Sequence, residues 1–452
     1  MNAAQKQFHR DASRSTADTS RRAFVRRALR GYETKRDETK ATFVDWERAR
    51  DAAASIKADA IAHLDDYLRE FERNFTARGG KVYWANDGAS ACAYILATAR
   101  ERAVRSIVKS KAMTSEEVHL NPALEAAGYK VVESDLGEFI QQLAGEPPYH
   151  FVFPCMHLQR DEISALFERE LGAAHTENPE ELTMIARRFL RRQYLEADMG
   201  ISGGNFIVAD TGMISITENE GNARLTTALP KIHIALVGIE KVVPRMADLA
   251  LFLPMLATAG TGQHITGYNS MYGGPRQPGE IDGPEEFHVV LLDNHRTRLL
   301  ADAEQRDALH CIRCGACLNV CPIFKNIGGH AYGTTYQGPI GSVITPHFRG
   351  LQQWKHLSGA SSLCGACTEA CPVKIDIHHH LLHNRRNAAA QKPVWWERIF
   401  WAGFSLVMTR PRLYALATSL APFAQQIHRW IERSPLDPLR AWTKTRDFPD
   451  AA

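Results

Sequence analysis

The spacing of hydrophobic residues changes along the chain and predicts regions of different structure. From about residue 20 to 78, apolar side chains such as Ile56, Leu64 and Phe71 recur at helical intervals, which predicts a helical N-terminal arm. From about residue 80 to 300, short β-rich runs alternate with helical stretches, an order typical of an α/β domain. The candidate strands are Lys81 to Ala85, Ser106 to Lys109, Lys130 to Glu133, His150 to Phe153, Phe206 to Ala209, Met213 to Thr217, Ile232 to Val237 and Phe287 to Leu292. The candidate helices are Ala89 to Arg105, Asp161 to Leu171 and Pro179 to Glu196.

The remaining sequence predicts a long loop, a cysteine-rich module and a helical tail. Gly260 to Gly283 is rich in glycine and has no clear periodicity, so we expect an ordered loop there. The tail carries many Trp and Arg residues, with helical stretches broken at Pro411, Pro422 and Pro435. We therefore divide the chain into a helical arm (1–78), an α/β domain (79–300), a cysteine-rich module (301–385) and a helical tail (386–452).

Composition excludes several classes of protein. The chain has 452 residues, 44% of them hydrophobic and 23% charged, with a formal net charge of +3. These values are ordinary for globular proteins and give no general electrostatic case for binding nucleic acid. The polar, Arg-rich start does not resemble a signal peptide, so we expect a cytoplasmic protein. The apolar run Ile399 to Met408 is about half the length that a bilayer requires, so no transmembrane segment is predicted.

Seven of the nine cysteines fall between residues 311 and 371, which indicates metal binding rather than a disulfide framework. The first run is Cys311-Ile-Arg-Cys314-Gly-Ala-Cys317-Leu-Asn-Val-Cys321-Pro. This is the C-x2-C-x2-C-x3-C-P pattern of bacterial ferredoxins, in which three thiolates bind one cluster and the fourth cysteine binds the other cluster.

The second run, Cys364-Gly-Ala-Cys367-Thr-Glu-Ala-Cys371-Pro, has Ser361 where the leading cysteine of the pattern would stand. Reciprocal pairing then predicts two ligand sets. The first set is Cys311, Cys314, Cys317 and Cys371, and the second is Cys321, Cys364 and Cys367. The fourth iron of the second cluster could be bound by Ser361, another side chain or solvent, or could be absent from a three-iron cluster.

Structural zinc is the main alternative to iron and sulfide. A zinc site needs only four ligands, usually two C-x2-C pairs. It does not explain two matching runs that both end in C-x3-C followed by proline. Two 4Fe–4S clusters in one small module favour electron transfer. The chain shows no Rossmann glycine fingerprint or Walker loop in the required context, so its electron donor and acceptor must lie elsewhere.

Several strings outside the cysteine module carry a family resemblance. They are Val108 to Glu117, Glu133 to Glu138, Asn205 to Gly212, Asn219 to Asn222, Gly238 to Pro244 and Ala441 to Asp447. With the cysteine runs, they make the chain resemble the lactate utilisation protein B family, iron–sulfur proteins with a LUD domain. The resemblance extends from about residue 40 to the string near the end.

The resemblance implies a fold, a role and partners. The middle domain is expected to be an α/β LUD domain similar to the ribose-phosphate isomerase and CoA-transferase-like fold, joined to an α-helical ferredoxin-type module. The role is that of a non-autonomous electron-transfer subunit in the oxidation of L-lactate to pyruvate. The implied partners are a cysteine-rich subunit and a second LUD-domain protein. The chain departs from the family pattern at Pro154 to His157, where alanine is usual in place of Cys155.

The residues of the α/β domain leave its chemistry open. Lys109 and Lys111, followed by Glu116 and Glu117, could open a ligand site at the carboxyl end of a strand, or could form an exposed turn. Asn219 to Asn222 could be a ligand loop or a plain turn. The catalytic residues, the terminal electron acceptor and the oligomeric state stay unassigned.

Isolated residues have simpler interpretations. We expect Cys92 and Cys155 to be packed thiols, and His157 to be a hydrogen-bonded histidine rather than a catalyst. We expect His378 to His380 and His383 to face solvent or a partner, because adjacent residues of a helix point in different directions.

The alternative function is that of a LUD-type enzyme or small-ligand sensor, in which the clusters are structural or sense redox state.

Overall fold

A computed structural model describes residues 1–393, 395–431 and 437. The chain forms two compact units, Met1–Arg386 and Asn387–Ala452. The first unit contains the sheets, the N-terminal helices and the cysteine-rich module. The residue limits of the four predicted regions stay predictions.

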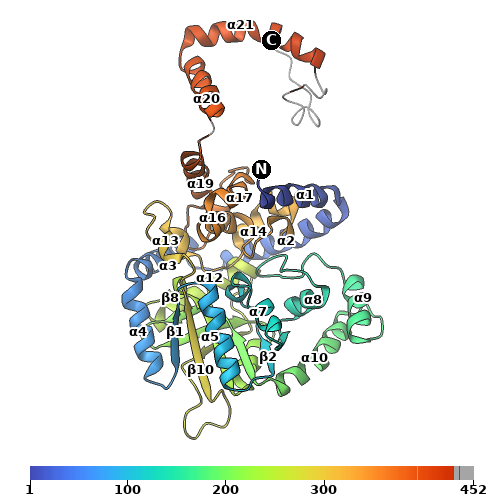
Figure 1. Ribbon diagram of the computed structural model, residues 1–452, viewed down its shortest axis with the longest axis vertical. Helices are drawn as coiled ribbons and strands as arrows, with labels where there is room; N and C mark the ends of the chain where they lie inside the picture. The colour runs from blue at the N-terminus through green and yellow to red at the C-terminus, as the bar shows by residue number, and fades with distance from the viewer. Residues whose placement is uncertain (394, 432–436, 438–452) are drawn as a thin grey trace. The chain divides into compact units, whose positions relative to one another are not determined.

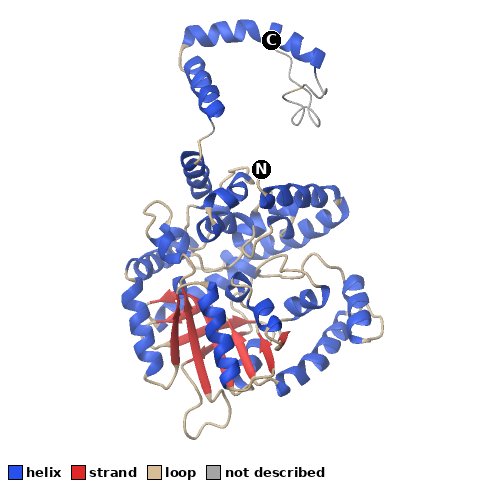
Figure 2. Cartoon of the chain, viewed as in Figure 1, coloured by secondary structure: helices blue, strands red, loops and turns tan. Residues whose placement is uncertain are grey.

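The α/β domain is built on a six-stranded sheet in which every pairing is parallel. Its strand order is β1-β10-β7-β4-β2-β3. Figure 2 shows this sheet enclosed by helices, as expected of parallel strands that are apolar on both faces. The strands are β1 (Lys81–Ala85), β2 (Ser106–Lys109), β3 (Lys130–Glu133), β4 (Met199–Ser202), β7 (Ile232–Gly238) and β10 (Glu286–Leu292).

Different helices cover the two faces of the large sheet. Helices α5 (Gly88–Glu101) and α7 (Leu120–Ala126) pack on one face. Helices α8 (Leu136–Ala144), α9 (Arg160–Leu171) and α10 (Pro179–Glu196) pack on the opposite face near β2 and β3. The mixed α/β class predicted from the alternating pattern is therefore confirmed.

A second sheet of four strands, in the order β8-β5-β6-β9, shares a core with β7 and β10. Its strands are β5 (Phe206–Val208), β6 (Met213–Glu218), β8 (Val242–Val243) and β9 (Tyr268–Tyr272). The short helices of the domain are α6 (Met113–Glu117), α11 (Asn222–Ala228), η1 (Ile239–Lys241), η2 (Met246–Asp248) and α12 (Leu249–Thr261).

The N-terminal arm is helical, as predicted, but it is divided into several helices. The arm consists of α1 (Ala3–Ala17), α2 (Thr19–Lys40), α3 (Trp46–Ala62) and α4 (Leu64–Thr76). Asp18 and Asp45 accept hydrogen bonds from the backbone N–H groups of Arg21 and Arg48. These aspartates therefore begin new helices inside the predicted helical span.

Short helices carry the cysteine module. Figure 1 shows α14 and α16 beside the sheet, at the end to which its strands point. The elements are α13 (Arg296–Leu300), η3 (Arg306–His310), α14 (Ala316–Val320), α15 (Phe324–Ile327), η4 (His330–Tyr332), α16 (Gly338–Arg349), α17 (Leu351–Gly359), α18 (Ala366–Glu369) and α19 (Ile377–Gln391).

The predicted strand at His150 to Phe153 is wrong, because this segment forms bends. The Nδ1 atom of buried His150 accepts hydrogen bonds from the backbone N–H groups of Val152 and Phe153, at 3.0 and 3.3 Å. A side chain that bonds its own local backbone replaces the ladder that a strand would need. The glycine-rich loop also differs from the expectation, because it contains strand β9.

The second unit contains α20 (Trp395–Met408) and α21 (Pro411–Ile431). The helix break at Pro411 is confirmed, whereas Pro422 lies inside α21, and Pro435 is outside the described residues. Within the described part of the chain, no helix is both long and apolar enough to cross a membrane.

Candidate iron–sulfur centre

The first cysteine run winds tightly, so that its thiols approach one another. Arg313 and Gly315 have left-handed backbone conformations, with φ of +61° and +81°, on either side of Cys314. Helix α14 then begins and carries Cys317. Cys311, Cys314 and Cys317 line one small apolar cavity together with Cys371 from the second run. The structure thus brings together the whole predicted first set.

The second run repeats this backbone conformation. Leu363 and Gly365 flank Cys364 with φ of +56° and +80°, and α18 follows them. Leucine rarely adopts this conformation. Its presence here therefore reflects a local fold that the second run shares with the first.

The repeat extends to the position of the missing cysteine. In the first run, the backbone N–H of Arg313 points to Sγ of Cys311, at 3.4 Å. In the second run, the backbone N–H of Leu363 donates to Oγ of Ser361, at 3.1 Å. The Ser361 hydroxyl therefore occupies the place in its own turn that the Cys311 thiol occupies in the first.

The second ligand set is also brought together. Burial raises the pKa of Cys321 and that of Cys367, and the charge of an ionised Cys364 would raise both further. The three cysteines therefore share one electrostatic environment. Cys364 is exposed, whereas Cys321 and Cys367 are buried. The two sets are neighbours, because Cys317 of the first set also interacts electrostatically with Cys367 of the second.

The thiols fit a group that binds thiolates. Burial raises the pKa of Cys371 to about 12 and that of Cys367 to about 11, so without a metal both stay protonated at neutral pH. The backbone N–H groups of Ile375 and Phe324 point to the sulfur atoms of Cys371 and Cys321, at 3.4 and 3.5 Å. Several converging buried thiols with N–H groups directed at sulfur are the surroundings that iron–sulfur clusters use.

Cationic side chains surround the first set. The Nε atom of Arg50 donates to the backbone carbonyl of Cys371 at 2.9 Å. Lys57, Lys241 and Arg313 each interact electrostatically with Cys311. This positive charge offsets the negative charge of a thiolate-ligated cluster. No sequence pattern pointed to these residues, which, except for Arg313, are separated from the cysteines by tens to hundreds of positions.

A buried ion-pair network joins the α/β domain to the first run. Arg296, which is fully buried, pairs with Glu117 at 2.8 Å and with Glu240. Glu240 also pairs with Arg313 at 3.2 Å, and the Tyr336 hydroxyl donates to Glu117 at 2.6 Å. Glu117, considered above as part of a ligand site or an exposed turn, therefore belongs to this network.

The other charged residues of that string have separate environments. Lys109 is buried and pairs with Glu133 at 2.8 Å and Glu116 at 3.3 Å. An exposed turn is therefore excluded for Lys109. Lys111 donates to the carbonyl of Val152 at 2.6 Å and lines a cavity.

That cavity has a volume of about 350 Å³ and lies at the carboxyl ends of β2 and β4. The chain leaves these adjacent strands toward opposite faces of the sheet, which is where α/β folds bind ligands. Asn219, Glu220 and Asn222 line the cavity, and the cysteine module closes it with Arg313, Cys314 and Tyr336.

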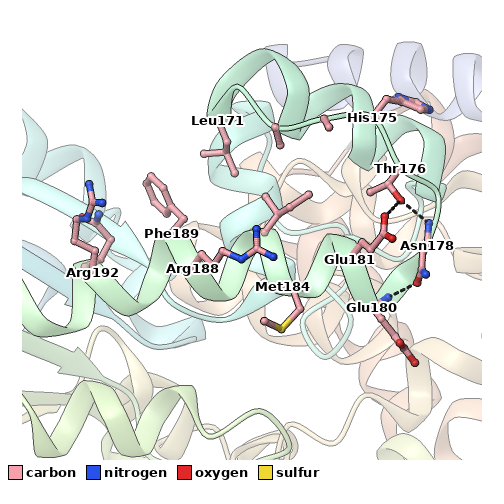
Figure 3. Close-up of a pocket in the computed structure, with 14 residues that line it drawn as sticks. Leu171, His175, Thr176, Asn178, Glu180, Glu181, Met184, Arg188, Phe189 and Arg192 are labelled. Carbon is pink, nitrogen blue, oxygen red and sulfur yellow. Dashed lines mark hydrogen bonds between the residues drawn. The ribbon is translucent and has the colours of Figure 1, made fainter.

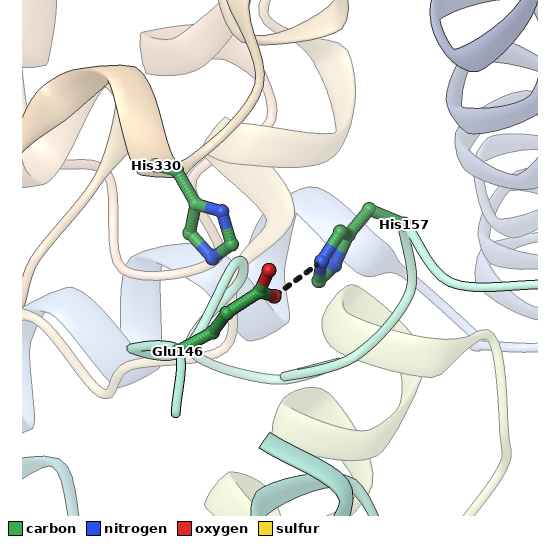
Figure 4. Close-up of side chains that lie close together, drawn as sticks. All are labelled: Glu146, His157 and His330. Atoms are coloured by element: carbon green, nitrogen blue, oxygen red, sulfur yellow. Dashed lines mark hydrogen bonds and ion pairs between the residues drawn. The ribbon is translucent and has the colours of Figure 1, made fainter. Parts of the chain in front are cut away.

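A histidine cluster lies where the loop after α8 meets the cysteine module. His157 Nε2 bonds a carboxylate oxygen of Glu146 at 2.9 Å, and the His330 ring lies beside them (Figure 4). Burial, and then the nearby His330, lower the pKa of His157 to about 4. His157 is therefore a hydrogen-bonded histidine, as predicted.

A second cavity, of about 810 Å³, lies along α9 and α10 (Figure 3). Its polar side chains bond one another, as Thr176 does with Glu181. Most of its lining is exposed, and it includes none of the predicted site residues.

The predictions for the lone cysteines and the histidine run are confirmed at some positions and wrong at another. Cys92 is buried in α5, as expected. Cys155 is partly buried, and burial raises its thiol pKa to about 11. The prediction for His380 is wrong, because its side chain is buried and pairs with Asp307 at 2.7 Å. His379 follows the prediction and is exposed.

Comparison with known proteins gives three family matches. They are the LUD domain over residues 68–292, the 4Fe-4S dicluster domain over 307–375 and "Lactate utilisation protein B, C-terminal" over 378–452. A solved structure of a DUF162 family protein from Deinococcus radiodurans is 14% identical, covers 51% of this chain and 98% of its own, and has a TM-score of 0.29, which is too low to carry an argument.

Three curated relatives are each named Lactate utilization protein B. The protein of Shouchella clausii is 41% identical, covering 98% of this chain and 94% of its own length. That of Bacillus subtilis is 42% identical, with coverages of 94% and 91%. That of Geobacillus kaustophilus is 44% identical, with coverages of 89% and 86%. With the cysteine geometry and the family matches, these identities show that the chain belongs to the lactate utilisation protein B family.

Proposed function

We propose that this chain is the iron–sulfur electron-transfer subunit of a multi-protein system that oxidises L-lactate to pyruvate, acting in the cytoplasm. The names of its relatives supply the substrate, and the two ligand sets supply the chemistry. The partners are a cysteine-rich subunit and a second LUD-domain protein, and the chain is not active on lactate by itself.

The observation that carries this proposal is the adjacency of the two sets. Cys317 and Cys367 belong to different sets and interact electrostatically within one small module. When bound, each cluster accepts and releases one electron at a time. The residues of the chain hold the clusters close together, exclude water from the first and balance its charge.

We assign one 4Fe–4S cluster to Cys311, Cys314, Cys317 and Cys371. The second uses Cys321, Cys364 and Cys367, and we propose Ser361 Oγ as its fourth ligand. The hydrogen bond that Leu363 donates to Ser361 matches the one directed at Cys311 in the first run, which supports this assignment over a solvent ligand.

The test is anaerobic purification followed by reconstitution. Iron and sulfide analysis should give two clusters per chain, with no stoichiometric zinc. On mixing with both partner proteins, L-lactate should produce the electron paramagnetic resonance signals of reduced clusters, whereas L-lactate with this chain alone should not. Stoichiometric zinc, or turnover of lactate by the isolated chain, would contradict the proposal.

The second candidate function is a LUD-type enzyme or small-ligand sensor. The cavity between the large sheet and the first cysteine run favours it, because a pure relay has no need of one. Reconstitution separates the two, because clusters that L-lactate does not reduce even with both partner proteins would indicate the enzyme or sensor.

A further inference from the structure

The cavity at the carboxyl ends of β2 and β4 is lined by a lysine that has no hydrogen bond or ion pair among the described residues. Lys241 is 8% exposed and lines the cavity. It forms no hydrogen bond or ion pair with any residue that the structure describes. The opposite charges near it are Glu240, which is already paired with Arg296 and Arg313, and Cys311 of the first set. A buried ammonium group with no hydrogen-bond acceptor is nevertheless unfavourable. Because Lys241 lines a cavity, an anion bound there would supply the acceptor that its ammonium group lacks.

The neighbouring lysines differ from Lys241 in this respect. Lys109 pairs with Glu133 and Glu116. Lys57 donates to the carbonyl oxygens of Glu240 and Val242 at 2.6 and 3.1 Å. Lys111 donates to a backbone carbonyl. Among these four lysines, Lys241 is the one whose ammonium is left for a molecule in the cavity.

A second donor lies on the same wall. Arg313 is held by Glu240 through Nη2 and lies over the Tyr336 ring at 4.4 Å, while its buried Nη1 has no hydrogen-bond partner. An arginine fixed in this way presents unused N–H groups in a defined direction. Lys241 and Arg313 together match the two oxygens of a carboxylate.

The lining of the cavity also includes acidic groups that already accept hydrogen bonds. Asp135 accepts from the N–H groups of Gly137 and Glu138 at the start of α8, and Glu218 accepts from those of Ala223 and Arg224 at the start of α11. Helix N-termini compensate such charges.

One acidic group of the cavity lining, Glu220, can form a hydrogen bond with a ligand hydroxyl. Glu220 accepts a single hydrogen bond, from the N–H of Leu136 at 3.0 Å. Burial and the charge of Asp135 raise the pKa of Glu220 to about 7, so it can both accept and donate a hydrogen bond near neutral pH.

We propose that this cavity binds a small 2-hydroxy or 2-oxo monocarboxylate, with its carboxylate held by Lys241 and Arg313 and its second oxygen facing Glu220. The site lies directly against the first cluster, because Cys314 is part of the cavity wall. The inference rests on the proposed function for its substrate class, and adds that this chain, rather than only its partners, binds the acid.

The test uses the anaerobically purified full chain with its clusters and without partner proteins. Titration with L-lactate, and separately with pyruvate, should give saturable binding by calorimetry and should perturb the resonance of the first reduced cluster. Propionate, which lacks the second oxygen, and inorganic phosphate should bind at least about tenfold more weakly.

Lys241→Met is the decisive variant. The substitution removes the cost of burying an ammonium group that has no hydrogen-bond acceptor. Arg50, Lys57 and Arg313 still balance the charge of the first set, so the iron content should stay close to that of the wild type. Affinity for lactate should fall by about tenfold or more, as for the loss of a charge-assisted hydrogen bond. Lys241→Arg should retain part of the affinity, and the exposed Lys231→Met is the matched control.

Two outcomes would overturn the inference. One is the absence of saturable binding of either acid. The other is equal affinity of Lys241→Met and Lys231→Met with a shifted cluster potential in the former, which would make Lys241 a counter-charge for the cluster alone. If lactate still reduced the clusters in the reconstituted system in either case, the relay would stand and only the site would be wrong.

Discussion

The two cysteine runs share one local fold but lie in different surroundings. Both place a left-handed residue before and a left-handed glycine after one cysteine, Cys314 in the first run and Cys364 in the second, and both then enter a short helix. The first set has four cationic side chains beside it, at Arg50, Lys57, Lys241 and Arg313. For the second set, the described residues supply Lys325, which is already paired with Glu33.

The local sequence of each run therefore determines how a cluster is held, whereas distant residues determine its charge environment and its access to solvent. The first set is closed in by the α/β domain, and the second includes the exposed Cys364. Proteins tune cluster potentials through nearby charge and exposure. We therefore expect the two clusters to differ in potential and in their response to substitution.

The largest effect is expected from removing a ligand of the first set. Cys314→Ala should lower the iron and sulfide content by about half and reduce solubility, because Lys57, Lys241 and Arg313 then lose the cluster charge that they balance. Cys367→Ala should lose a similar amount of iron with a smaller loss of stability.

Iron analysis measures the cluster content, and chemical denaturation under anaerobic conditions measures the stability. Cys92→Ala, a buried thiol outside both runs, is the matched control and should keep its iron. Equal destabilisation by Cys314→Ala and Cys367→Ala would show that the cationic surroundings do not matter for stability.

The next largest effect is expected from breaking the buried ion-pair network that joins the α/β domain to the first cysteine run. Arg296→Met leaves the buried carboxylates of Glu117 and Glu240 without this partner. Breaking a buried pair costs about 3–5 kcal/mol of unfolding free energy, measured by denaturation against wild type. The exposed Arg298→Met is the control, and a loss below about 1 kcal/mol would mean that the carboxylates find water or other donors.

Sequence reasoning reached the cluster ligands because their spacing is local. C-x2-C-x2-C-x3-C-P encodes one turn and one short helix, so reciprocal pairing could be predicted from residues at most 60 positions apart. Most long buried strands were predicted for a similar reason, since runs such as Ile232 to Val237 are apolar except for His233. Strand β4, Met199–Ser202, was missed because it contains a glycine, whereas the equally short β2 and β3, which have none, were predicted.

The surroundings of the clusters could not be predicted in this way. Arg50 bonds the carbonyl of Cys371, a residue 321 positions away, and no sequence pattern links the two. The strand proposed at His150 to Phe153 failed because a histidine side chain bonds its own backbone. Apolar β-rich composition alone does not reveal such a contact.

A smaller change should follow from altering Ser361. If its Oγ binds iron, Ser361→Ala should lose about one iron per chain and give the resonance signal of an oxidised three-iron cluster, while Ser361→Cys should keep four irons and shift the potential of the second cluster. The adjacent Ser362→Ala is the control. Unchanged iron and spectra in Ser361→Ala would assign the fourth site to solvent or another side chain.

The smallest effect is expected for a single charge beside each cluster. Arg50→Gln removes a cation near Cys371 and can keep a hydrogen bond to its carbonyl. Positive charge stabilises the more negative reduced cluster, so the potential of the first cluster should fall by tens of millivolts while that of the second changes less. Lys325→Gln should instead lower the potential of the second cluster and leave that of the first nearly unchanged. This shift should be smaller, because Lys325 is already paired with Glu33. Redox titration followed by electron paramagnetic resonance measures both potentials, and equal shifts in the two variants would mean that the clusters share one charge environment.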